Sequence, residues 1–142
     1  MRDIGPGCEA AMQQFERWIN SMTTRDFNVL NEVLADDVEF STDSRLGGQR
    51  LRKAEILALN GKMRGTVKLV NLVARKMSEN TVTSLILTEV KEEFEELGPD
   101  MPNAEAMNAL LGDARVAYAA AWRRSPEGKW QCYNYIMFGP VV

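Results

Sequence analysis

The sequence predicts an α+β protein in which one cone-shaped, curved, mostly antiparallel sheet wraps around three N-terminal helices. Apolar residues recur at helical spacing through the first part of the chain. From about residue 67 onward the pattern changes to β-branched strands that are separated by short turns. We expect the curled sheet to enclose a cavity over the long first helix.

Each predicted helix has its own start or stop signal. The first spans residues 8–24, because Phe15, Trp18 and Met22 lie on one face and a Gly-Pro-Gly breaker precedes it. Asp26 is the expected N-cap of a second, shorter helix, which continues through residue 34 and ends at two aspartates. A third helix is expected over residues 51–63, where glycines mark its end.

The strands follow as a nearly continuous series. We predict strands over residues 38–42, 67–73, 81–94, 116–124 and 130–138. The connection 96–113 is too long for a simple hairpin loop and contains a possible short helix at 103–111. We expect it to be a mobile cover near the mouth of the cavity, or an assembly element if it packs on a neighbouring subunit.

Composition excludes several classes of function. The net charge is −3 and the basic residues are scattered, so no nucleic-acid surface is expected. No apolar run approaches the length of a membrane span, which favours a cytoplasmic protein. The length of 142 residues is that of one ordinary domain, so we expect a single domain over residues 1–142. The chain has no histidine, which removes Ser-His-Asp and Cys-His catalysis and His-ligated zinc. We therefore predict neither a metal site nor a cofactor, and Cys132 is expected to be a small apolar residue in a strand.

Three segments together resemble the superfamily of ketosteroid isomerases, SnoaL-type cyclases and nuclear transport factor two. They are Phe15-x-x-Trp18 through Asp26-Phe27, then Leu34-Ala35-Asp36-Asp37-Val38, and finally Gly128-Lys129-Trp130-Gln131. The resemblance implies the cone-shaped fold. It does not imply one function, because the superfamily includes isomerases, cyclases, hydrolases, dehydratases, transport factors and oligomerisation modules.

The catalytic residues that the isomerases of this superfamily use are absent. Their mechanism needs a carboxylate base, a tyrosine and a protonated aspartic acid; ketosteroid isomerase is itself a standard worked example of this chemistry. The matching positions hold Thr42, Trp18 and Ala120. Asp43 beside Thr42 would serve as base only if a bulge turned it inward. We therefore do not expect a ketosteroid isomerase.

Reading across from the resemblance places an aromatic pocket between the sheet and the first helix. Glu89, Tyr133 and Tyr135 are the predicted acid-base and hydrogen-bonding residues. The other predicted ligand-binding residues are Trp18, Thr42, Leu85, Leu87, Tyr118, Ala120, Trp122 and Met137. Such a pocket suits an enzyme that acts on a small apolar carbonyl or polyketide-like compound, or a binding or oligomerisation module without chemistry. A slip of one residue would instead turn Thr88 and Val90 inward. The pocket would then receive no carboxylate from this strand, which would favour the binding module.

The opposite, convex face of the sheet is predicted to form a symmetric homodimer. Related domains commonly pair there, and a broad apolar sheet face is usually covered by a partner. The residues expected on that face are Asn71, Val73, Ile86, Val90, Trp130 and Ile136.

Overall fold

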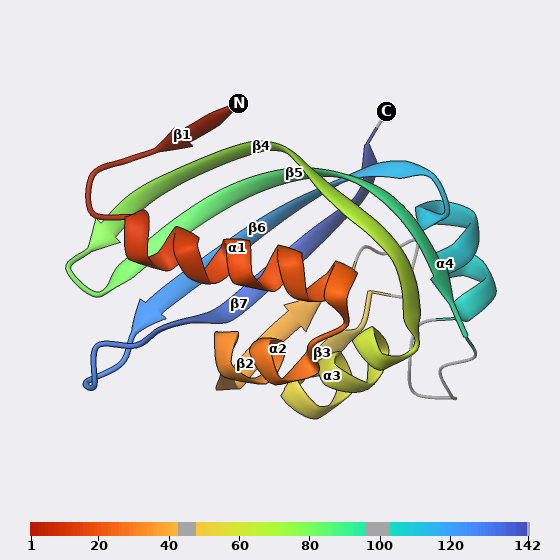
Figure 1. Ribbon diagram of the computed structural model, residues 1–142, viewed down its shortest axis with the longest axis horizontal. Coiled ribbons are helices and arrows are strands. Elements are labelled where there is room, and N and C mark those ends of the chain that lie inside the picture. Colours follow the sequence, from red (N-terminus) through yellow and green to blue (C-terminus); the bar gives the residue numbers. More distant parts are fainter. Residues whose placement is uncertain (43–47, 96–102, 142) are drawn as a thin grey trace.

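The computed structural model describes residues 1–42, 48–95 and 103–141 and has the predicted α+β architecture. One curved, unclosed sheet of seven strands, in the order β1-β4-β5-β6-β7-β2-β3, arches over helix α1 (Figure 1). Its strands are β1 (Arg2–Ile4), β2 (Leu34–Ser41), β3 (Arg50–Arg52), β4 (Met63–Ser78), β5 (Thr81–Phe94), β6 (Ala114–Arg124) and β7 (Trp130–Val141). Only the β1–β4 and β2–β7 pairs are parallel among these strands, so the predicted mostly antiparallel sheet is confirmed.

The helices lie where the periodicity placed them. They are α1 (Glu9–Thr24), α2 (Phe27–Val33), α3 (Lys53–Gly61) and α4 (Ala104–Leu111). Asp26 caps α2, because its carboxylate accepts a hydrogen bond from the backbone N–H of Asn28 at 3.2 Å. Helix α1 buries Phe15 and Trp18 against the sheet.

Several element boundaries differ from the predicted ones. Strand β2 begins at Leu34, where we expected the second helix to continue, and β4 extends far beyond the predicted 67–73. Strands β1 and β3 were not predicted at all. Each has three residues, too few to show a period of two, and each forms by pairing with a longer strand.

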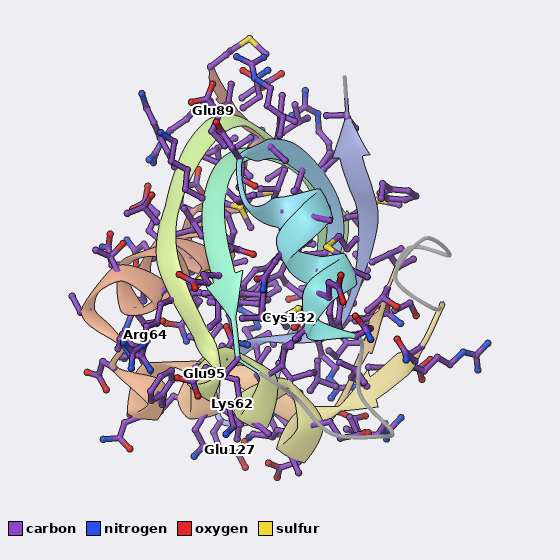
Figure 2. All side chains as sticks on the ribbon, turned by 90° about the vertical axis from the view of Figure 1, so that its right-hand side faces the viewer. Lys62, Arg64, Glu89, Glu95, Glu127 and Cys132 are labelled. Carbon is purple, nitrogen blue, oxygen red and sulfur yellow. The ribbon has the colours of Figure 1, made fainter. Side chains whose placement is uncertain are left out.

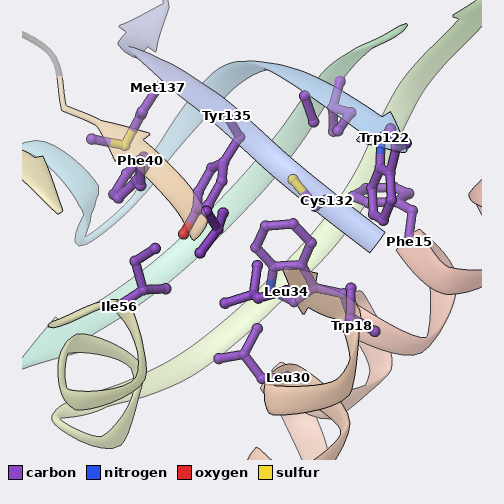
Figure 3. Close-up of a cluster of buried hydrophobic side chains, with 14 of the residues drawn as sticks. Phe15, Trp18, Leu30, Leu34, Phe40, Ile56, Trp122, Cys132, Tyr135 and Met137 are labelled. Carbon is purple, nitrogen blue, oxygen red and sulfur yellow. The ribbon is translucent and has the colours of Figure 1, made fainter. Parts of the chain in front are cut away.

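The core lies on the concave side of the sheet. Trp122 is fully buried, makes edge-to-face contacts with Phe15 and Trp18, and donates its indole N–H to Ser84 Oγ at 3.0 Å (Figure 3). Cys132 is likewise fully buried in β7, and burial raises the pKa of its thiol to about 12, so it stays protonated and apolar as predicted.

Strand β4 contains a glycine, Gly65, close to its first residue. This residue has φ +144°, which side chains other than hydrogen rarely allow, and a Cβ placed there would lie 1.9 Å from the carbonyl oxygen of Lys91. Gly65 pairs with Glu92 across the ladder, and Glu92 lines the cavity described next.

Among the described residues, none of the helices combines the length and the apolar character that crossing a membrane requires.

Candidate functional site

A cavity of about 80 Å³ lies between the concave face of the sheet and helices α1, α3 and α4. Most of its lining is apolar. Its aromatic residues are Phe15, Trp18, Phe40, Phe94, Tyr118 and Tyr135. This volume is well above what a single water molecule needs, so the cavity has room for a small molecule.

One carboxyl group faces this cavity, and it belongs to Glu92 on β5. The residue is only 5% exposed, and its side chain has no hydrogen bond or ion pair with any described residue. Desolvation raises the pKa of Glu92 from its usual 4.5 to about 7. Glu92 therefore exchanges a proton near neutral pH, which is the range in which a general acid or base works best.

Three further polar groups of the lining can donate hydrogen bonds. Burial raises the pKa of Tyr118 and of Tyr135 above the usual 10, so both phenols stay protonated; the charge of Glu92 adds to the shift at Tyr118. The indole N–H of Trp18 is buried and has no acceptor among the described residues. Buried donors without a partner are costly, so this N–H is available to an acceptor in the cavity.

Helix α4 is attached to the sheet beside the cavity through Asn108. Its amide accepts from the backbone N–H of Phe94 at 2.6 Å and donates to the carbonyl of the same residue at 3.2 Å. Met107 and Leu111 of this helix line the cavity. The predicted helix at 103–111 thus lies beside the cavity, whereas residues 96–102 of the expected cover lie outside the described residues.

Five of the predicted pocket residues line the cavity. Trp18, Tyr118, Ala120, Tyr135 and Met137 all do so, and Tyr135 stacks on Phe40 with ring centroids 4.2 Å apart (Figure 3).

The predicted residues Trp122 and Thr42 are buried but do not line the cavity. Trp122 lies behind Trp18, with their ring centroids 6.2 Å apart. Thr42 hydrogen-bonds the backbone of Gln49 instead. Asp43, the alternative base, lies outside the described residues.

The predicted orientation of β5 is wrong by one residue. Leu85 is 57% exposed, Leu87 lies on the same outer face, and Glu89 forms an exposed ion pair with Arg115 at 2.9 Å (Figure 2). The inner face carries the alternate residues, including Ile86, Thr88 and Glu92, of which Thr88 donates its hydroxyl to the carbonyl of Val116 at 3.1 Å. The alternative register, with Thr88 and Val90 turned inward, is the one observed, and Glu92 supplies the carboxyl that we did not expect from it.

Tyr133 also lies outside the cavity, because β7 contains a bulge. Cys132 pairs with Trp122 and Asn134 with Ala121, which leaves Tyr133 as one extra residue. Its ring lies under the guanidinium of Arg123, 4.9 Å from the Arg123 Cζ atom.

The residues on the convex face differ from the predicted ones, because the faces of β5 are exchanged and β7 contains a bulge. Ile86, Val90 and Trp130 are buried on the concave side. A row of paired residues crosses four strands on the outside, namely Val73, Leu85, Ala119 and Ile136. Leu85 and Ile136 in this row are among the exposed large apolar residues.

Several solved structures superpose on this chain over most of its length. An NTF2-like protein from Cytophaga hutchinsonii superposes with a TM-score of 0.72 at 18% identity, over 92% of this chain and 96% of its own. A candidate calcium/calmodulin-dependent kinase II association domain from Exiguobacterium sibiricum also gives 0.72, at 10% identity over 99% of this chain and 98% of its own. A candidate ketosteroid isomerase from Shewanella frigidimarina gives 0.63, at 12% identity over 95% and 98%.

No protein-family model and no curated protein sequence matches the chain. At these identities the likeness concerns the fold, which is the NTF2-like, cystatin-like α+β fold that the sequence segments suggested.

Proposed function

We propose that this chain, which has the NTF2-like fold, binds a small, largely apolar molecule in the cavity and exchanges a proton with it through Glu92. The observation that carries the proposal is a buried carboxyl group that faces an apolar cavity and has no partner among the described residues. Burying such a group costs several kcal/mol unless something in the cavity offsets it. A bound molecule that hydrogen-bonds or pairs with Glu92 supplies that compensation.

The same groups support acid-base chemistry. A carbonyl substrate would accept a hydrogen bond from the Trp18 indole or the Tyr118 hydroxyl, while Glu92 moves a proton. We predicted Tyr133 and Tyr135 as the hydrogen-bonding residues and Glu89 as the acid-base residue. In this proposal Trp18 and Tyr118 are the hydrogen-bond donors, and Glu92 replaces Glu89. A neighbour described as a candidate ketosteroid isomerase is consistent with such chemistry in this fold, although the residues here are different.

A larger side chain in the cavity wall should weaken the binding of a small ligand. We expect Ala120→Leu, which adds a side chain to the cavity wall, to weaken the binding of cyclohexanone at least about tenfold. Ala121→Leu is the matched control, because the next residue points to the other face of the same strand and is half-buried there. Calorimetric titration measures both, and native mass spectrometry of the purified wild type should reveal a bound small molecule. Cyclohexanone that does not bind the wild type, or that binds both variants equally, contradicts the proposal.

Assembly is a second candidate function, favoured by the apolar row on the convex face. Val73, Leu85, Ala119 and Ile136 form a continuous line that a second copy would cover. One of the structural neighbours is described as an association domain. We propose that the chain forms a symmetric homodimer through this face.

A charge in the middle of this row should separate the two copies. We expect Leu85→Glu to sediment as a 16.0 kDa monomer, while the wild type sediments at twice that mass, because pairing would bury an uncompensated carboxylate. Met77→Glu is the control, since Met77 is also exposed but lies outside the row. A wild type that is monomeric at micromolar concentration excludes the dimer.

A further inference from the structure

We infer that the ligand carries a basic nitrogen, so that the cavity recognises a small apolar amine in its protonated form through the carboxylate of Glu92. This inference rests on the proposed ligand-binding function of the cavity. It starts from the charge of the lining. Among the described residues that line the cavity, Glu92 is the only aspartate or glutamate, and no lysine or arginine accompanies it.

Within the part of the chain that the structure describes, no lysine or arginine beside Glu92 lines the cavity. Across the ladder β4 places Gly65 opposite, and the neighbouring Arg64 is exposed. Arg64 and Lys62 lie near Glu95 on the outside, with nitrogen–oxygen distances of 3.7 and 3.9 Å (Figure 2).

The remaining neighbours are uncharged or turned outward. Helix α3 contributes Asn60 to the lining, whose amide donates to the carbonyl of Ile56. Strand β6 contributes the protonated Tyr118, and Glu105 of α4 is exposed. Lys91, next to Glu92 in sequence, lies on the exposed outer face of β5. A cation from the ligand is therefore the partner that would fit the carboxylate.

The aromatic lining suits the same ligand. Six rings surround the cavity, and the faces of aromatic rings attract cations, by about 2 kcal/mol or more where water is excluded. An anionic ligand would be repelled by Glu92, and no lysine or arginine among the described lining residues would receive it.

A neutral carbonyl compound would not offset the negative charge of Glu92 once this residue is ionised. The indole N–H of Trp18 is already an unpaired, uncharged donor that would satisfy a carbonyl oxygen. The burial of a carboxylate is offset most fully by an opposite charge. An amine that also carries an acceptor oxygen would pair both groups, the nitrogen with Glu92 and the oxygen with Trp18.

Two compounds that share a ring and differ in their polar group test the inference. Cyclohexylamine is a cation throughout the range from pH 6 to pH 8, whereas cyclohexanone is neutral. Because the amine binds the ionised form of Glu92, whose pKa is about 7, its affinity for the wild type should rise about tenfold from pH 6 to pH 8. The affinity of cyclohexanone should stay level or fall over the same range. At pH 8 the amine should bind at least about tenfold more tightly than the ketone.

Glu92→Gln should remove both the preference for the amine and its pH dependence, while cyclohexanone still binds. Glu93→Gln makes the same chemical change on the exposed face and should leave both unchanged. If neither compound binds the wild type, the proposed ligand-binding function fails. If cyclohexanone binds as tightly as the amine at pH 8, or if the amine keeps its preference in Glu92→Gln, the cavity binds ligands but the inference of an amine is wrong.

Discussion

Replacing Glu92 by Gln should raise the free energy of unfolding by about 3 kcal/mol at pH 8 and by less than about 1 kcal/mol at pH 5. The folded state holds the Glu92 carboxyl at a pKa of about 7, above the 4.5 expected for the unfolded chain. Below 4.5 both states are protonated and the carboxyl has no effect. As the pH rises from 4.5 to 7 the unfolded state releases its proton first, so the wild type loses stability. The amide of Gln does not ionise and avoids this loss.

Urea unfolding of both proteins at the two pH values measures the difference. Glu93→Gln is the control, because it removes a carboxylate from the exposed face next to Glu92, and its effect should stay within about 0.5 kcal/mol. A Glu92→Gln variant that is equally destabilised or stabilised at pH 5 and pH 8 would contradict the buried, titrating carboxyl.

Replacing Gly65 by Ala should lower the free energy of unfolding by about 3 kcal/mol. The new methyl group would lie 1.9 Å from the Lys91 carbonyl oxygen, and φ +144° is a strained conformation for alanine. The obstacle is backbone, which a side-chain rotation does not relieve. Because Gly65 pairs with Glu92, the variant should also disturb the cavity.

Gly61→Ala is the matched control for this prediction. Gly61 ends α3, nothing lies within 4 Å of a Cβ placed there, and alanine favours a helix, so the variant should be neutral or slightly more stable. Thermal unfolding of the two variants, measured side by side, compares their stabilities. Equal stability of the two variants would show that β4 does not need a glycine at residue 65.

The helices and the long strands were predictable because their signals are local. Phe15 and Trp18 lie one turn apart in α1, and Asp26 caps α2 with its own side chain. The limits of β5 were also predicted, since turns bound it on one side and its β-branched residues are continuous. None of these features needs knowledge of the rest of the chain.

The face of β5 was not predictable in the same way, because both faces carry apolar residues. Leu85 and Leu87 point outward, whereas Ser84 and Thr88 point inward and satisfy their hydroxyls on backbone carbonyls of β6. Polarity alone therefore favours the wrong face. The bulge at Tyr133 is set by pairing with β6 and leaves no mark in the sequence of β7.

Glu92 was not predicted as a cavity residue, because it belongs to the run of glutamates at residues 92–96, and such a run is usually exposed to solvent. Its neighbour Glu93 is exposed, as such a run suggests. A period of two that starts from Val82 and passes through Ile86 and Val90 places Glu92 on the inner face. This alternation was visible in the sequence, but the structure was needed to decide which of the two faces of β5 points inward.

Glu92 is a buried carboxyl that faces an apolar cavity. A pH titration of its side-chain carboxyl carbon by ¹³C NMR, assigned by comparison with Glu92→Gln, measures its pKa directly. We expect a midpoint near pH 7, well above the usual 4.5. A midpoint near 4.5 would place the carboxylate in water or beside a cation of the protein, and would show that Glu92 is not the buried, titrating group proposed here.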